Sequence, residues 1–260
     1  MMFKSIIYEK TGDIATVYLN RPEKLNSLSS SMCKELVAAI NMASDDKTRV
    51  MIIKAKGRAF CAGADLEEIK SVANKPDMAK NFFDQINRVF FSLEEAPYPV
   101  IAAVNGLALT GGLELLMACD IIVAAEESQL GDHSSNYGLI PGGGGIQRLP
   151  RIIGMHRAKY LMLTGEWLSA QEALEIGLVN IVVPENDLEN AVHELAINLT
   201  KKSPLVNKKV KKLMHQGINM NIKDAIELEI FNAVEHLRSE DCIKGIEAFE
   251  QRKKPVFKGR

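Results

Sequence analysis

Short apolar, β-branched runs alternate with helix-like segments in the first half of the chain, and this alternation restricts the possible folds most strongly. Residues 14–20 and 50–57 end at turn residues, as strands do. Between them, apolar residues at 32, 36, 40 and 43 recur at helical spacing behind a serine cluster. Residues 100–106 and 121–125 are apolar throughout, which is typical of strands buried on both faces. The pattern predicts a layered α/β core.

The pattern changes after Pro184. Residues 188–199, 205–213, 222–237 and 242–249 all have helical periodicity. We therefore expect residues 1–195 to form the core, and residues 196–260 to form a helical C-terminal region of the same structural unit.

Charge and hydropathy restrict the partners. The formal net charge of -1 gives no bulk attraction to nucleic acid or to a membrane. No apolar run approaches the roughly 20 residues of a membrane span. The basic run "KKSPLVNKKVKKL" at 201–213 is interpreted as a solvated helix face rather than an anion site. Neither nucleic acid nor membrane is an expected partner.

The cysteines and the termini indicate the compartment. The four cysteines are scattered without metal-ligand spacing, which is typical of reduced thiols. The five histidines form no ligand pattern either, so no metal is expected. The N-terminal residues contain no apolar signal core, and "VFKGR" is not a peroxisomal tripeptide. The expected location is the cytoplasm.

The segment "AVNGLALTGGLELLMACD" at 103–120 contains a first candidate site. A buried strand ends at Asn105-Gly106, and Gly111-Gly112 then begins a helix. Helix starts carry unpaired N–H groups and the positive end of the helix dipole, so a developing negative charge would be stabilised there. Glu114 lies in the first turn, either as a catalytic group or as a carboxylate that complements the dipole.

A second strand-to-helix junction is "GRAFCAGADLEEI" at 57–69. Its small residues, Ala62-Gly63-Ala64, leave the backbone accessible, so a second N–H donor could come from here. Two donors from separate junctions would form an oxyanion hole. Other motifs are absent: Leu113 stands where a phosphate-binding loop needs lysine, and no dinucleotide fingerprint or nucleophile elbow is found.

A third feature is the polar loop "QLGDHSSNYGLIPGGGG" at 129–145. Four successive glycines contribute little to packing, so a bare backbone is required there. Asp132 is the only carboxylate in the polar stretch that precedes them.

Together these segments resemble the crotonase superfamily, the enoyl-CoA hydratases and isomerases, over essentially the whole chain. The matching motifs are "LNRPEKLNSLS", "AFCAGADL", "IAAVNGLALTGGLELLMACDI", "GLIPGGGGIQRLPRIIG", "LTGEWLSAQEALEIGLVNIVVP" and "KGIEAFEQRKKPVF". The resemblance implies a spiral of ββα turns with a helical C-terminal trimerisation region. It also implies a homotrimer or a dimer of trimers.

The resemblance further implies an acyl-CoA thioester as the substrate, with no separate cofactor. By position, the N–H groups of Ala64 and Gly111 would hold the thioester oxygen and stabilise an enolate. The residues expected to bind substrate or CoA are Lys24, Ala62, Ala64, Asp65, Leu66, Gly111 and, from a neighbouring subunit, Phe249 and Arg252.

Hydratases of this family use two glutamates around one water. The first matches Glu114, but Ser134 occupies the position of the second. A serine can hydrogen-bond to water but cannot deprotonate it at pH 7. Glu114 could act alone while Ser134 orients water, Asp132 or His133 could replace the missing carboxylate, or the reaction could differ. Thr110 is a second departure, because glycine is common at that position.

The resulting expectation is an enzyme that stabilises a thioester enolate, most simply an enoyl-CoA or dienoyl-CoA hydratase with Glu114 as acid and base. The alternatives are an acyl-CoA decarboxylase, isomerase or hydrolase of the same fold, or a non-catalytic scaffold that binds CoA esters or RNA.

Overall fold

The computed structural model describes residues 3–260, and two sheets form its centre. The larger sheet has the order β1-β2-β3-β5-β7-β10; only the pairing of β1 with β2 is antiparallel. Its strands are β1 (Ile6–Thr11), β2 (Ile14–Leu19), β3 (Val50–Ala55), β5 (Val100–Val104), β7 (Ile121–Ala125) and β10 (Ile181–Val183).

The smaller sheet has the order β4-β6-β8-β9. The first three strands are parallel, and β9 is antiparallel to β8. These strands are β4 (Ala59–Cys61), β6 (Leu107–Leu109), β8 (Gln129–Gly131) and β9 (Leu168–Ser169).

Each of three successive strands of the larger sheet is followed by a strand of the smaller sheet and then by helical structure. This sequence of β3-β4, β5-β6 and β7-β8 units is the ββα spiral that the sequence motifs predicted, so the predicted fold class is confirmed. The helices of this part are α1 (Ser30–Asp45), α2 (Leu66–Val72), α3 (Pro76–Glu95), α4 (Gly111–Met117), α5 (Gly145–Ile153), α6 (Met155–Thr164), α7 (Ala170–Glu175) and α8 (Leu188–Thr200), with short 3-10 turns η1 (Pro22–Lys24), η2 (Ser134–Tyr137) and η3 (Glu185–Asp187).

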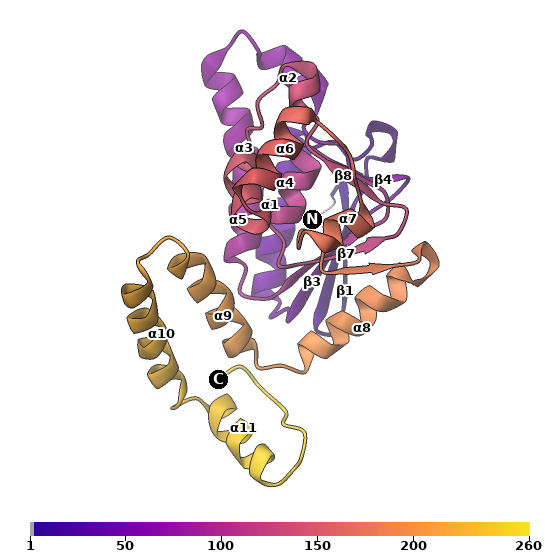
Figure 1. Cartoon of the computed structure of the whole chain (residues 1–260). Coiled ribbons are helices and arrows are strands. Elements are labelled where there is room, and N and C mark those ends of the chain that lie inside the picture. Colours follow the sequence, from indigo (N-terminus) through magenta and orange to yellow (C-terminus); the bar gives the residue numbers. More distant parts are fainter. Residues whose placement is uncertain (1–2) are drawn as a thin grey trace.

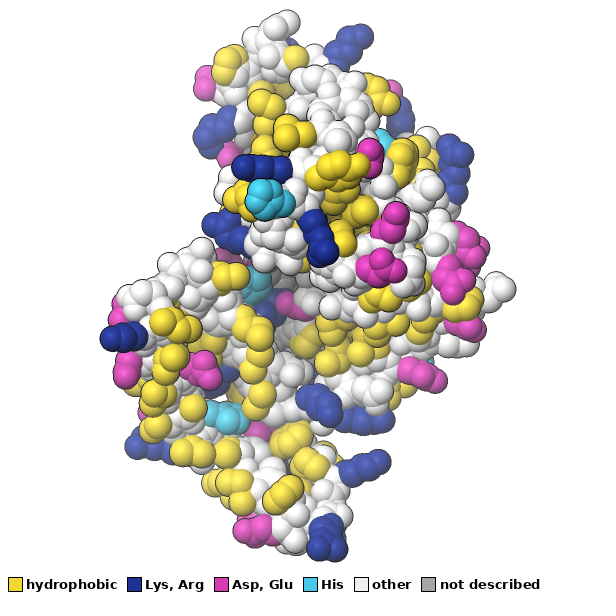
Figure 2. All heavy atoms as spheres, in the orientation of Figure 1, with side chains coloured by type: hydrophobic (Ala, Val, Ile, Leu, Met, Phe, Trp, Pro, Cys, Tyr) yellow, Lys and Arg dark blue, Asp and Glu magenta, His cyan; other side chains and the backbone are white. Residues whose placement is uncertain are grey.

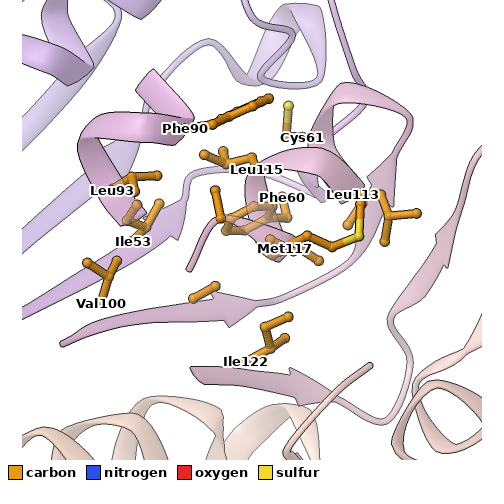
Figure 3. Close-up of a cluster of buried hydrophobic side chains, with 14 of the residues drawn as sticks. Ile53, Phe60, Cys61, Phe90, Leu93, Val100, Leu113, Leu115, Met117 and Ile122 are labelled. Carbon is orange, nitrogen blue, oxygen red and sulfur yellow. The ribbon is translucent and has the colours of Figure 1, made fainter. Parts of the chain in front are cut away.

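The larger sheet is covered on both faces, as its continuous apolar strands predicted. Met51 and Ile53 of β3 belong to the main core, whereas Val50 and Ile52 belong to a second cluster completed by α8. Successive side chains of a strand alternate between faces, so one apolar run serves two layers. In Figure 3, side chains of α3 and α4 pack over the strands in the main core.

Helix α4 lies inside the protein rather than on its surface. All of its residues are buried, and its side chains pack beside β4 and α3 (Figure 3). A helix with apolar residues all round is expected in such a position. The charged side chain of this helix, Glu114, is therefore held away from bulk water.

The C-terminal helices leave the core after α8 and extend from it as an arm (Figure 1). The arm consists of α9 (Pro204–Gly217), α10 (Ile222–His236) and α11 (Glu240–Glu250). The predicted boundary at residue 195 falls inside α8, whose Ala196 is still part of the second core cluster. No helix among residues 3–260 is long and apolar enough to cross a membrane.

The basic run at 201–213 is not wholly solvated, because Lys211 departs from this expectation. This side chain is buried, and its Nζ donates to the backbone carbonyl oxygens of Leu93 and Tyr98 and to the Asp120 carboxylate. The interpretation of the run as a wholly solvated face is therefore wrong at Lys211, which attaches α9 to the core. The sequence spacing did not distinguish this lysine from its neighbours.

Candidate active site

Three segments that follow strands of the smaller sheet meet at one edge. Strands β4, β6 and β8 are parallel, so their carboxyl ends lie together. The residues after them are Ala62-Gly63-Ala64, then Thr110-Gly111, then Asp132-His133-Ser134. Ligands of α/β proteins commonly bind at this edge of a sheet. The structure thus brings together candidate segments that lie up to 72 residues apart in sequence, from Ala62 to Ser134.

The first two junctions touch each other through their glycines. A Cβ atom added to Gly111 would lie 3.1 Å from the backbone nitrogen of Ala64, and one added to Gly112 would collide with the carbonyl oxygen of Cys61. Within residues 3–260, neither the N–H of Ala64 nor that of Gly111 donates to a protein acceptor. Two free donors are therefore held side by side, as an oxyanion hole requires.

Thr110, the residue before this pair, has a strained backbone. Its φ is 47° and its ψ is -111°, a combination that β-branched residues rarely adopt. The conformation is fixed from both sides: the N–H of Thr110 donates to Gly131, and its carbonyl oxygen accepts from Glu114. This geometry explains why glycine suits the position and why threonine there is a departure.

Glu114 lies in the first turn of α4 and is only 4% exposed. Its Oε1 accepts a hydrogen bond of 2.7 Å from the backbone N–H of Gly145. This N–H belongs to the first residue of α5, which is also the last glycine of the run at 142–145. The carboxylate is therefore held by a donor from a distant loop rather than exposed as a helix-start charge.

The pKa of Glu114 is raised from 4.5 to about 7, chiefly by burial. The negative charge of Asp132 contributes to this rise, whereas the N–H groups of Gly145 and Gly143 and the charge of Arg148 oppose it. A carboxyl group that exchanges its proton near pH 7 can act as both acid and base in one reaction cycle.

The need for glycine in the run at 142–145 is steric. A Cβ at Gly143 would collide with Oε2 of Glu114, and one at Gly145 would lie 3.0 Å from Oε1. A Cβ at Gly142 would collide with the ring of Phe83. The bare backbone lets this loop close over the Glu114 carboxylate, and the run leads into α5.

Two side chains hold this glycine loop from behind. The Asn87 amide donates to the carbonyl oxygen of Gly142 at 2.8 Å, and Arg148 donates to that of Gly143 at 2.7 Å. Arg148 is itself paired with Glu94 at 2.5 Å. The loop that contacts Glu114 is thus fixed by α3 and α5.

The first three residues after β8, Asp132 to Ser134, are buried. Ser134 is 6% exposed, and its backbone N–H donates to Oδ1 of Asp132 at 2.9 Å. The ring of His133 packs edge-on against Trp167, with centroids 4.1 Å apart, and burial lowers the pKa of this histidine. Asp132, His133 and Ser134 therefore all lie inside the protein at this edge.

The residues expected to contact CoA lie around the β4 junction. The Lys24 ammonium is paired with Glu67 at 2.5 Å and is exposed, as is Leu66. Asp65 is buried: it caps α2 and bonds to Arg21 at 2.9 Å. Burial raises the pKa of Asp65, but Arg21 and the cap N–H groups hold it below its ordinary value.

Phe249 and Arg252 lie at the other end of the molecule. Phe249 is on α11, far along the arm from α4 in Figure 1, and its side chain is 85% exposed. Arg252 follows this helix and is also exposed. Their contact with CoA in a neighbouring subunit stays a prediction.

Sequence reasoning identified the Glu114 segment but missed most of what surrounds it. The N–H of Gly145, the Gly143 backbone and the Arg148 guanidinium were not among the predicted site residues. The one available signal was the glycine run, which indicated a close approach without naming its partner.

Comparisons with known proteins show the family. The enoyl-CoA hydratase/isomerase family model matches residues 9–260. The chain is 38% identical to the short-chain-enoyl-CoA hydratase of Clostridium acetobutylicum over 263 residues, covering 100% of both chains. It is 35% identical to the mitochondrial methylglutaconyl-CoA hydratase of Homo sapiens, over 96% of this chain and 75% of that protein.

A crystal structure of an enoyl-CoA hydratase from Bacillus anthracis superposes with a TM-score of 0.94 at 36% identity, covering 99% of this chain and 100% of that one. The chain belongs to the enoyl-CoA hydratase/isomerase family of the crotonase superfamily.

Proposed function

We propose that this enzyme hydrates a 2-enoyl-CoA thioester, with Glu114 as acid and base and the N–H groups of Ala64 and Gly111 as the oxyanion hole. One observation carries the proposal: the Glu114 carboxyl is buried, has a pKa of about 7, and lies three residues after one of two free adjoining N–H donors. Such a pair of donors beside a proton-exchanging group suits addition of water to a conjugated thioester.

The proposed reaction starts with the thioester oxygen bound by both N–H groups. Water adds to C3 of the enoyl group, and the electrons of the double bond move to the thioester oxygen, where the donors stabilise the enolate. Proton transfer to C2 then completes the 3-hydroxyacyl-CoA. Glu114 takes part in the proton transfers, and the Ser134 hydroxyl orients the water or the substrate. The reaction needs no cofactor, because CoA is part of the substrate.

The CoA portion is proposed to lie along Lys24, Ala62, Asp65 and Leu66, beside the β4 junction. The exposure of Lys24 and Leu66 supports this placement, because both side chains can be reached from outside. Asp65 would contribute by holding the junction, since its carboxylate is occupied by the cap and by Arg21.

We propose a homotrimer or a dimer of trimers, in which Phe249 and Arg252 contact CoA in a neighbouring subunit. Apolar side chains gather on the surface of the arm (Figure 2), and monomeric proteins seldom expose so large an apolar area. Exposed apolar side chains of the arm include Val210, Met214, Ile218, Ile222, Ile226, Ile230, Phe231, Val234, Leu237, Ile243, Ile246 and Phe249. Light scattering should give a trimer or hexamer; a stable monomer would contradict the shared CoA site.

We also propose that the enzyme acts in the cytoplasm and binds neither nucleic acid nor membrane. The four cysteines are free thiols, as a reducing compartment favours. The basic run gives little support to RNA binding, because Lys211 is buried and Lys209 donates to the Asn232 carbonyl oxygen.

The test is loss of the enoyl absorbance of crotonyl-CoA and of 3-methylglutaconyl-CoA, substrates suggested by the names of two relatives. Glu114→Gln keeps the size of the side chain and removes its acid–base function. Turnover should fall about 10²–10⁴-fold in the variant, with acyl-CoA affinity within a few-fold. Unchanged turnover would contradict the role of Glu114. Saturable binding of both esters without hydration would favour decarboxylation, isomerisation or hydrolysis of another acyl-CoA.

A further inference from the structure

Asp132 presents a buried carboxylate oxygen with no partner. Its side chain is 1% exposed; Oδ1 accepts the N–H of Ser134 at 2.9 Å, but Oδ2 has no hydrogen-bond partner within residues 3–260. A buried carboxylate oxygen without a partner is costly, and native proteins rarely retain one without a reason. A ligand that donates a hydrogen bond would satisfy it.

The position of Asp132 is fixed by strand pairing beside Glu114. Gly131 is in register with Leu109, and its carbonyl oxygen accepts the N–H of Thr110 at 2.9 Å. Asp132, the next residue after Gly131, therefore lies beside the start of α4. Its negative charge is one of the causes that raise the pKa of Glu114, so the two carboxylates lie within electrostatic reach of each other.

Asp132 is not explained as a structural ion pair. Among the described residues, no lysine or arginine forms a salt bridge with it. Arg148, which lowers the pKa of Glu114, is bound to Glu94 and to the Gly143 carbonyl oxygen.

The other titratable groups at this site provide no cation either. His133 is a neighbour in the chain, and its Nε2 is buried and unpartnered. Burial lowers the pKa of His133, while Asp132 opposes that effect. The buried thiol of Cys61, on the β4 side, has a pKa raised to about 12, mainly by burial and also by the charge of Glu114. The carboxylate of Asp132 thus remains available to a ligand.

We propose that Asp132 supplies the second carboxylate of this site, in place of the glutamate whose position Ser134 occupies. This inference rests on the proposed hydration reaction, and it gives Asp132 the role of base, so that Glu114 acts as the acid. Oδ2 of Asp132 binds the attacking water and takes one of its protons as the oxygen bonds to C3. Glu114 donates its proton to C2 of the enolate. The proton on Asp132 then returns to Glu114 through solvent, so that one water has been added and both carboxyl groups are restored.

The assignment of the two roles follows from the environments of the pair. Glu114 is buried under the glycine loop and carries its proton near neutral pH, which suits the donor. Asp132 has one oxygen locked by the Ser134 N–H and one left open, which suits an acceptor of fixed orientation. Two carboxyl groups held in different environments commonly divide the acid and base roles in this way.

The test compares Asp132→Asn, Glu114→Gln and Glu127→Gln. Asparagine keeps the acceptor for the Ser134 N–H and removes the charge. Glu127 is exposed, lies just before β8 and is remote from the proposed chemistry, so its variant controls for loss of one carboxylate. Three quantities are measured: hydration of the two enoyl-CoA esters, calorimetric affinity for butyryl-CoA, which cannot be hydrated, and the infrared titration of the Glu114 carboxyl, assigned with Glu114→Gln.

We expect Asp132→Asn to lower kcat about 10²–10⁴-fold, with butyryl-CoA affinity within about three-fold, and Glu127→Gln to retain wild-type rates. Glu114 should also titrate at a lower pH in Asp132→Asn, because the negative charge beside it is removed. The loss of kcat at nearly unchanged affinity is the result that a merely structural role would not produce. Hydration by Asp132→Asn within three-fold of wild type, alongside an inactive Glu114→Gln, would overturn the pairing and leave the hydratase assignment intact.

Absence of hydration by the wild type would instead overturn the proposed function. The infrared titration still decides whether the two carboxyl groups are coupled in that case. An unchanged titration of Glu114 in Asp132→Asn would overturn the inference about Asp132.

Discussion

The backbone N–H of Gly145 donates to Oε1 of Glu114 at 2.7 Å, across 31 residues of sequence. The contact joins the start of α5 to the first turn of α4, and it depends on the absence of a side chain at Gly143 and Gly145. The Glu114 carboxyl group in this enclosure has a raised pKa and a fixed orientation. Catalysis needs both properties, whereas folding alone would not favour them.

Replacement of Glu114 by glutamine should change the pH dependence of stability. The pKa of Glu114 is about 7 when folded, against a reference value of 4.5. A raised folded pKa means that its contribution to the free energy of unfolding is present below pH 4.5 and is lost as the pH rises to about 7. The expected loss is about 3 kcal/mol, and Glu114→Gln should not show it.

Urea unfolding at pH 5 and pH 8, at one protein concentration, checks this expectation. The variant should gain stability relative to the wild type as the pH rises. Equal differences between the two proteins at both pH values would show that Glu114 is not held protonated by its surroundings.

Replacement of Gly143 by alanine should damage both stability and turnover. The new Cβ would collide with Oε2 of Glu114 and lie 2.6 Å from the ring of Phe90. We expect a loss of about 1–3 kcal/mol and a turnover at least tenfold lower. Gly217→Ala is the matched control, because its Cβ would meet only the Ala225 methyl at 3.5 Å. Wild-type kinetics for Gly143→Ala would contradict the described enclosure.

The sequence was sufficient to predict the elements and the family but not the contacts of the site. The continuous apolar runs that form β5 and β7 predicted a doubly covered sheet, because every residue of such a strand is buried. No local sequence pattern indicates that Glu114 and Asp132 lie close together. Their proximity arises from the pairing of Leu109 with Gly131, which depends on tertiary structure rather than on any sequence period.

Backbone strain and buried charge were also invisible in the sequence. Nothing local to Thr110 indicates its positive φ, which results from bonds to Gly131 and Glu114. Lys211 has the same spacing as exposed lysines, and only the meeting of α9 with α3 buries it. Such features depend on partners that are distant in sequence.

Lys211→Met should destabilise the attachment of the arm. The ammonium group satisfies two carbonyl oxygens and pairs with Asp120 at 2.7 Å. Burial raises the pKa of Asp120, and the charge of Lys211 opposes this, so removing the lysine leaves an uncompensated carboxylate. A loss of about 3–5 kcal/mol is expected.

Hydrogen exchange locates that effect. Amides of α9 should exchange faster in Lys211→Met, whereas those of β3 and β5 should keep their protection. Lys212→Met, which changes an exposed neighbour, is the control. Unaltered protection of α9 in Lys211→Met would show that other contacts hold the arm.

Thr110→Gly should stabilise the protein. Glycine adopts the observed φ of 47° and ψ of -111° without the clash that a Cβ causes. The expected gain is about 1 kcal/mol, reduced by the larger chain entropy of glycine in the unfolded state. Thr110→Ala removes the hydroxyl but keeps the Cβ, so it should show no such gain. Equal thermal midpoints for the two variants would refute the strain at this residue.

Ser134→Glu distinguishes a site that lacks a carboxylate from one that already has two. Glu114 and Asp132 share a buried region, and Ser134 is 6% exposed beside them. A third carboxylate there would repel both and raise the pKa of Glu114 further, because like charges disfavour ionisation. Hydration of crotonyl-CoA should therefore fall at pH 7, and more steeply than in Ser134→Gln, which has the same size without the charge. A rise in hydration for Ser134→Glu alone would mean that the site lacks its second carboxylate and that Asp132 does not supply it.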